Sequence, residues 1–216
     1  FWTDKDSTEA LIGVSQLLDK KTVLTADFTF GHDEGYLNDP YRGVFFTGWT
    51  GINNEVTMPV IRPDHRNKEV LQIGLTHFFE SANASLEGAY RIYHDGYDIT
   101  AHTLALNWHQ HLGKHLLIEP LVRFYEQSEA SFYTPLGVPG YFPGDGITRP
   151  ANYSADYRLS HFWSLTYGLQ ASVIIKEKFY LDLGYHRYEM RGLDDVTSPL
   201  LYPKANIFTI GLRVWF

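Results

Sequence analysis

The sequence predicts an all-β protein, an antiparallel up-and-down transmembrane β-barrel. Three observations predict it: the pattern of the last residues, the aromatic content and the lengths of the connections. Residues 208–216 alternate, with the apolar positions Phe208, Ile210, Leu212, Val214 and Phe216. Such a strand has one wholly apolar face. An apolar edge invites aggregation in a soluble protein, whereas a barrel strand needs one face for lipid and one for a polar lumen.

The composition agrees with a barrel and argues against other classes. The chain has 216 residues, enough for one large all-β domain, and 16% of them are aromatic, as the girdles of a barrel require. No apolar run approaches the roughly 18 residues of a transmembrane helix. A net charge of −7 argues against a nucleic-acid partner, and with no cysteine the chain has no disulfides.

The first two strands are expected at residues 10–18 and 22–31, joined by the turn 19–21. The second alternates clearly, with Leu24 and Phe28 on one face and Asp27 on the other. Residues 32–66 follow as a long loop rich in Gly, Pro, Asn and Asp, and we expect them to be irregular.

Four strands follow, expected at residues 67–80, 84–94, 98–110 and 115–128. Their apolar faces carry Leu71, Ile73 and Leu75, then Leu86, Tyr90 and Ile92, then Leu104, Leu106 and Trp108, then Leu116, Val122 and Phe124. Pro120 also falls on an apolar face, where it removes a ladder donor. The second long loop, 129–156, contains four prolines.

The last three strands are expected at 157–174, 179–190 and 208–216, with a loop at 191–204 before the final one. The turns 19–21, 81–83, 111–114 and 175–178 then fall at one end of the meander. All three long loops fall at the other end, beside the short turn 95–97. Outer-membrane barrels have short periplasmic turns and long external loops, whereas a Greek-key sandwich mixes lengths at both ends. We therefore expect one barrel domain over residues 1–216 in a Gram-negative outer membrane.

An odd strand count has a further implication. Bacterial single-chain barrels have an even number of strands. With nine strands the first would descend from the outer side, so we expect the sequence to be the C-terminal part of a longer chain and of a larger barrel. The alternative is an unrecognised strand within 40–62.

Polar residues on the inward faces are candidates for a lumen lining. Glu87 and Arg91 lie two strands from Glu119 and Arg123, with the small Thr103 and Ala105 between them. We predict a charged ladder of these four, flanked by Asn107, His109 and Tyr125. Such a lining could select solutes by charge, or the pairing could be purely structural.

No cofactor, metal or enzymatic activity is expected. Histidines and carboxylates gather at the outer end, but no spacing matches a metal motif. Ser160 and His161 are adjacent and so face opposite sides of a strand, while Asp182 and His186 are about 13 Å apart on one face. Aromatic residues in the long loops could form a gate, a ligand site, a dock for a partner, or packing that merely closes the barrel.

Several motifs together resemble a family of bacterial outer-membrane proteins, the domain-of-unknown-function family 3570. They lie at residues 35–42, 62–66, 90–95, 101–103, 120–128, 132–133 and 153–160. The resemblance implies a barrel in the outer membrane and implies no activity. The chain ending also resembles the terminal strand that outer-membrane barrels present to their assembly machinery, so Phe208, Ile210, Leu212, Val214 and Phe216 form a candidate assembly signal.

The function expected from these observations is a pore or transport channel for small solutes. The alternative is a scaffold barrel that anchors or sheathes a periplasmic or surface partner, such as a redox protein. Outer-membrane lipid and the barrel-assembly machinery are the partners that a barrel requires.

Overall fold

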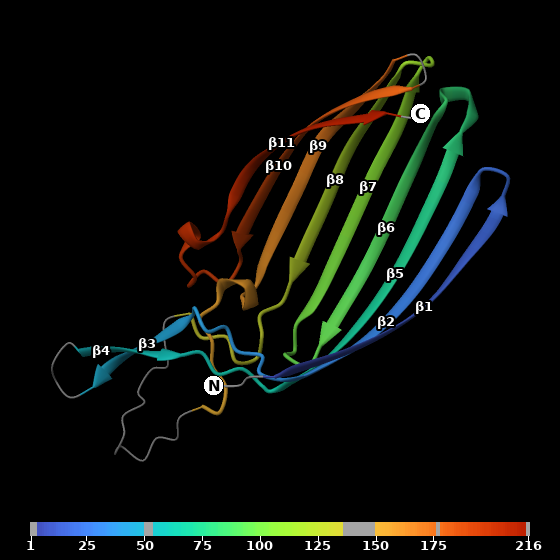
Figure 1. The fold of residues 1–216 in the computed structure, drawn as a ribbon. Coiled ribbons are helices and arrows are strands. Elements are labelled where there is room, and N and C mark those ends of the chain that lie inside the picture. The colour runs from blue at the N-terminus through green and yellow to red at the C-terminus, as the bar shows by residue number, and fades with distance from the viewer. Residues whose placement is uncertain (1–3, 50–53, 136–149, 176–177, 215–216) are drawn as a thin grey trace.

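Nine strands form one antiparallel sheet in the computed structural model, which describes residues 4–49, 54–135, 150–175 and 178–214. The strands follow one another in chain order, so the sheet is an up-and-down meander, as Figure 1 shows. They are β1 Lys5–Asp19, β2 Thr22–Gly35, β5 His65–Phe79, β6 Ala84–Asp95, β7 Thr100–Leu112, β8 Leu116–Gln127, β9 Phe162–Ile175, β10 Phe179–Gly192 and β11 Lys204–Val214. The predicted fold class is confirmed.

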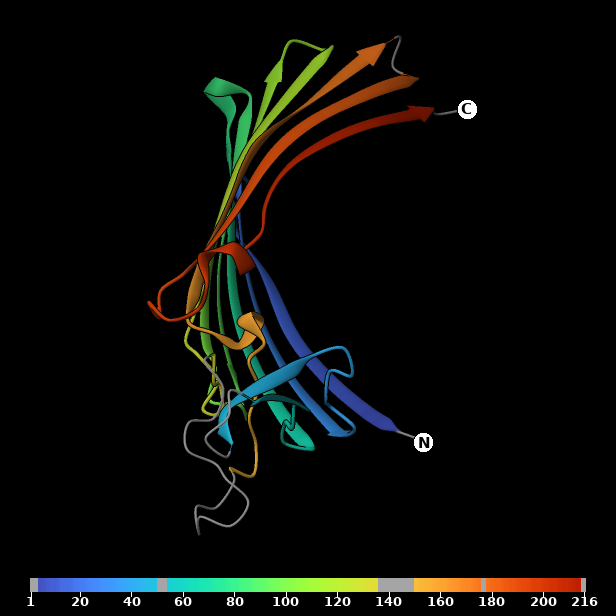
Figure 2. The ribbon, with the colours of Figure 1, turned by 90° about the vertical axis from the view of Figure 1, so that its left-hand side faces the viewer.

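The sheet is a curved wall whose two ends differ. Short turns join the strands at one end, while the long connections gather at the other end, where β1 also begins (Figure 1). Viewed from the side, both edges of the wall bend toward the same side (Figure 2). Strands of 11 to 15 residues exceed the five or six usual in globular proteins and suit a tilted membrane span.

The alternation of faces is as predicted. Phe208, Ile210 and Leu212 on β11 are 76%, 81% and 70% exposed, and their row continues with Val214. Leucines and aromatics on the same face of the other strands are also exposed. An exposed apolar face of this extent is what a barrel presents to lipid. Phe216 lies outside the described residues. No helix in the part of the chain that the structure describes has the length and hydrophobicity of a membrane span.

Residues 32–66 are more ordered than predicted. They contain a hairpin of β3 Gly43–Trp49 and β4 Asn54–Pro59, separate from the main sheet. β2 runs on to Gly35 and β1 starts at Lys5, because the two strands stay in register from Lys5↔Gly35 to Leu17↔Val23. The irregular composition of this segment hid the hairpin, and because it stands apart, the main sheet still has nine strands.

Two other strand boundaries were also wrong. Residues 157–174 were expected to be one strand, but Tyr157–Leu159 form a 3₁₀ turn and β9 begins at Phe162. The turn starts where the Asp156 side chain accepts a hydrogen bond from the backbone N–H of Arg158. The last strand, β11, begins at Lys204 and includes part of the predicted loop.

The buried core lies mostly at the loop end of the sheet. One cluster joins Val44, Val60 and Tyr153 from the two long loops. A second joins Tyr97, Ile99, Ala130, Phe132 and Leu159, and a third joins Phe162, Met190 and Tyr202. A β-sandwich would instead bury a continuous layer between two facing sheets. The core therefore fastens loops onto one barrel wall.

Candidate functional site

The seven residues predicted to line the lumen lie on one face of β6, β7 and β8. Glu87 pairs with Asn107, Arg91 with Thr103, and Arg123 with Ala105. Because Thr103 also pairs with Tyr125, the register carries the same face across all three strands. The loops fold onto this face, since the Gln127 side chain donates to the carbonyls of Arg158 and Ser160.

Within the described residues, the four predicted ladder residues do not pair with one another. His109 lies between the two glutamates, with Nδ1 2.7 Å from Glu119 Oε1 and Nε2 3.7 Å from Glu87 Oε2. No ion pair within the described residues joins these glutamates to Arg91 or Arg123. Four residues along a strand separate each glutamate from the arginine on its own strand, about 13 Å, so His109 is the nearer partner.

The two arginines have aromatic neighbours instead. The guanidinium carbon of Arg91 lies 5.5 Å from the ring centre of Tyr93, and that of Arg123 lies 5.8 Å from Tyr125. Cation–π contact of this kind favours a guanidinium without neutralising it. Neither arginine donates a hydrogen bond or forms an ion pair within the described residues, so both keep their full charge on the inner face.

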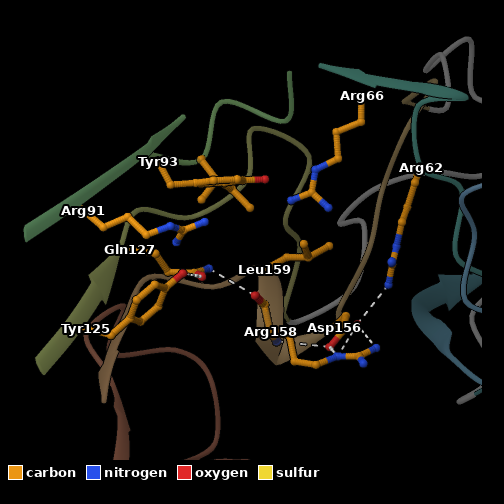
Figure 3. Close-up of a pocket in the computed structure, with 10 residues that line it drawn as sticks. Arg62, Arg66, Arg91, Tyr93, Tyr125, Gln127, Asp156, Arg158 and Leu159 are labelled. Atoms are coloured by element: carbon orange, nitrogen blue, oxygen red, sulfur yellow. Dashed lines mark hydrogen bonds and ion pairs between the residues drawn. The ribbon is translucent and has the colours of Figure 1, made fainter. Parts of the chain in front are cut away.

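An arginine pocket lies where the loops meet this face (Figure 3). We use this name for the cavity of about 370 Å³ lined by four arginines, Arg62, Arg66, Arg91 and Arg158, together with Tyr93, Ile99, Tyr125, Gln127, Asp156 and Leu159. Its floor comes from the sheet and its cover comes from the segments before β5 and β9. Its position where two long loops meet the polar face makes it the candidate functional site.

Arg66 is held by a buried carboxylate. Its Nε donates to Asp95 Oδ2 over 2.8 Å, and its Nη2 contacts the same oxygen. The Asp95 side chain is fully buried and also accepts from Tyr93 Oη at 2.5 Å and from the N–H groups of Tyr97 and Ile99. The guanidinium of Arg66 stacks 4.4 Å from the Tyr97 ring centre. Asp95 and Tyr97 therefore hold the guanidinium of Arg66 in place beside the pocket.

Arg62 and Arg158 share the carboxylate of Asp156. Arg62 Nη2 lies 2.9 Å from Asp156 Oδ2, and Arg158 Nε lies 2.9 Å from both carboxylate oxygens. Arg158 Nη2 reaches Asp39 Oδ2 at 2.6 Å as well. Burial opposes ionisation of Asp156, but the hydrogen bonds from Arg158 outweigh it and hold the pKa of this carboxyl below its ordinary value.

Backbone contacts tie the loops to each other. Ile61 and Tyr153 exchange N–H···O bonds of 3.0 and 2.7 Å, which links the segment before β5 to the segment before β9. Tyr133 Oη lies 2.5 Å from Thr197 Oγ1 and so adds the third loop. Burial raises the pKa of Tyr133 to about 12, so its phenol stays protonated at neutral pH.

The loop aromatics are only partly described. Phe132 packs in the second cluster, with its ring 4.9 Å from that of Tyr97 and nearly perpendicular to it. Tyr36 is 40% and Tyr41 95% exposed. The side chains of Phe45, Phe46 and Trp49, with all of Tyr141 and Phe142, lie outside the described residues.

The outer histidines and carboxylates are spread over separate partners. Asp33 pairs with Lys68 at 2.6 Å and with Lys5 at 3.5 Å, and His32 contacts Asn67. No group of three residues able to hold a metal occurs within the described ranges.

Ser160 and Asp182, considered above for catalysis, contact groups other than the nearby histidines in the structure. The Ser160 hydroxyl donates to the Tyr157 carbonyl and contacts Tyr202 Oη rather than His161. Asp182 is paired with Arg213 rather than with His186.

Three of the four pocket arginines were not among the predicted lining residues. Arg62 and Arg66 lie outside the predicted strands and Arg158 is the second residue of one, where alternation carries little information. Their signal was in the sequence nonetheless. Arg62 and Arg66 bound the motif at 62–66, and Asp156 and Arg158 belong to the motif at 153–160.

A protein-family comparison agrees with these motifs. Residues 2–203 match the family described as a protein of unknown function, DUF3570. The chain belongs to this family. No curated protein matches the sequence of this DUF3570 chain.

A solved structure shares the fold of the DUF3570 chain. It is OmpT folded in vitro, an outer membrane protein of Vibrio cholerae, with a TM-score of 0.57 and 8% sequence identity. The match covers 98% of this chain and 56% of that chain, so the DUF3570 chain spans little more than half the length of that protein. At this identity the likeness shows the fold alone, which is that of an outer-membrane β-barrel protein.

Proposed function

We propose that this protein is an outer-membrane pore that carries small hydrophilic solutes along its polar inner face. The observation that carries the proposal is the charge left on that face. Arg91 and Arg123 stand on neighbouring rows of the wall without a carboxylate partner among the described residues. Fixed arginine charge in a channel favours anions over cations.

The arrangement of the loops supports the same function. Gln127 on β8 holds the loop before β9 against the inner face, and the Arg62–Asp156 pair joins that loop to the segment before β5. Loops held inside a barrel narrow its lumen, and a narrow lumen brings solutes close to the wall charges, where screening by water is weaker. The apolar row of β11 fits contact with lipid and a role in recognition by the assembly machinery.

Ion conductance across planar bilayers tests the proposal. The purified protein should give unit current steps, and the reversal potential under a salt gradient should indicate a preference for anions. Arg123→Glu places a carboxylate at the same position and should shift that preference toward cations. A preference left unchanged by this substitution would overturn the role of the inner face in selection.

If the protein gives no current steps in the bilayer and a second protein co-purifies with it in fixed proportion, the result would favour the scaffold alternative. The exposed Tyr41 and Leu200, each 95% exposed, would then be the first residues to test for contact with such a partner.

A further inference from the structure

We propose that the arginine pocket is a binding site for a small anion that carries a phosphate group. The proposal deepens the pore function, on which it rests, because it names the class of solute that the inner face would hold. Four guanidinium groups line one cavity of about 370 Å³ and approach it from β5, β6 and both loop segments. Guanidinium forks match phosphate oxygens in geometry and in charge.

Unused donors point to a ligand. Within the described residues, Arg62 uses only Nη2, while Arg66 and Arg158 use Nε and Nη2, in hydrogen bonds to carboxylates. The Nη1 group of each is therefore without an acceptor in that part of the chain. Arg62 Nε is buried and also lacks one. A buried donor without an acceptor costs free energy, which a bound oxyanion would recover.

Arg91 is the pocket arginine that has no hydrogen-bond or ion-pair partner among the described residues. Its guanidinium lies over the face of Tyr93, and none of its five N–H donors has an acceptor among the described residues. Figure 3 shows its guanidinium and that of Arg66 both directed into the pocket from opposite walls. Like charges that converge repel each other, and an anion placed between them turns this repulsion into attraction.

The local charge balance leaves the pocket positive. The carboxylates that reach its arginines are those of Asp39, Asp95 and Asp156. Four arginines against these three aspartates leave one positive charge, and it belongs to Arg91. Donors that arrive from several directions suit the three oxygens of a tetrahedral phosphate better than the two coplanar oxygens of a carboxylate.

The remaining lining leaves room for an organic part. Ile99, Leu159 and the rings of Tyr93 and Tyr125 form apolar and aromatic wall, and the cavity volume lies within the range of small-molecule sites. The pocket opens on the polar face rather than on the exposed apolar face, so a soluble phosphate is the expected occupant and a lipid headgroup is not.

Calorimetric titration of the full chain in detergent micelles with inorganic phosphate tests the site. Phosphate should bind with one site per chain, and Arg91→Gln should weaken binding about ten-fold or more, since a charge-assisted bond is lost. Arg91→Lys keeps the charge but loses the planar guanidinium, so its affinity for phosphate should lie between that of the unaltered chain and that of Arg91→Gln. Arg123→Gln removes an equal charge from the same face but outside the pocket, and it should weaken binding by less than about three-fold.

The outcomes separate this site from the pore. No binding to the unaltered chain, or equal loss in Arg91→Gln and Arg123→Gln, would overturn the phosphate site whatever the conductance. Binding without conductance would overturn the pore and leave the site. Micelles of short-chain phosphatidylglycerol that abolish phosphate binding would assign the pocket to a lipid headgroup and overturn the soluble occupant.

Discussion

Arg62, in the segment before β5, places its guanidinium 2.9 Å from the carboxylate of Asp156, in the segment before β9. The two residues are 94 positions apart in the sequence. Asp156 is 1% exposed and also receives Arg158. One carboxylate thus joins two loops that the meander brings to the same end of the sheet.

Replacing Asp156 with Asn should release these loops. A buried guanidinium that loses its carboxylate costs about 3–5 kcal/mol, and the half-exposed position of Arg158 places this case at the lower end. Limited trypsin digestion should then cut after Arg158, which precedes Leu159, faster than in the unaltered chain, whereas Arg62 precedes Pro63 and is not a trypsin site. Asp39→Asn is the matched control, because Asp39 contacts the half-exposed Arg158 but not Arg62, and an amide oxygen can still accept from the Tyr41 N–H, so the change should cost less than about 1 kcal/mol. Equal cutting in both variants would contradict the role assigned to Asp156.

Low pH should release the loops as Asp156→Asn does, because protonation also removes the charge of Asp156. The pKa of Asp156 is lower in the folded chain than its ordinary 3.8, so ionised Asp156 stabilises the folded loops. This stabilisation is complete above the ordinary pKa and is lost as the pH falls through the lowered value. The near-ultraviolet circular dichroism of the packed loop tyrosines should therefore stay constant down to about pH 5 and decline well below pH 4. In Asp156→Asn this step should be absent.

The two faces of β7 should respond oppositely to an added charge. Leu106 lies on the exposed apolar face at the middle of the strand, and Asn107 is its neighbour on the polar face, opposite Glu87. Leu106→Arg should destabilise the protein in lipid vesicles by about 2–4 kcal/mol, the cost of arginine near the bilayer midplane. Asn107→Arg should cost little, because Glu87 can pair with it. Denaturant unfolding in vesicles measures both, and similar losses would argue against a lipid-facing Leu106.

Period-two alternation was enough to predict the sheet. Away from the loop end, the described strands do not pack against a second sheet, so lipid and water decide which residues fit each face. That choice is visible in the sequence, as at Leu106 and Asn107. The turns could be assigned because they are short. Register followed from the turns, which is why Glu87, Asn107 and Arg123 were placed on one face in advance.

The pocket could not be predicted in the same way. Arg62 and Arg158 reach it through loops with no periodicity, and their positions depend on long-range contacts such as Ile61 with Tyr153. Arg91 was predicted as a lining residue, but its contact with Tyr93 was not, because alternation gives the face of a side chain and not the neighbour nearest to it. His109 was the nearer group for both glutamates.

A close approach between β9 and β10 yields a last prediction. Gly168 faces His186 across the two strands, and a methyl group at Gly168 would lie 2.3 Å from the His186 ring and 2.4 Å from the Tyr185 carbonyl oxygen. The carbonyl belongs to the backbone and cannot move without parting the strands, so Gly168→Ala should cost about 1–3 kcal/mol. At Gly211 the nearest atom would be Asp182 Cβ at 3.5 Å, an ordinary contact. Gly211→Ala should therefore change the free energy of unfolding by less than about 0.5 kcal/mol in the same denaturant measurement. A loss equal to that of Gly168→Ala would contradict the prediction, because it would mean that strand propensity, and not contact with β10, requires glycine at position 168.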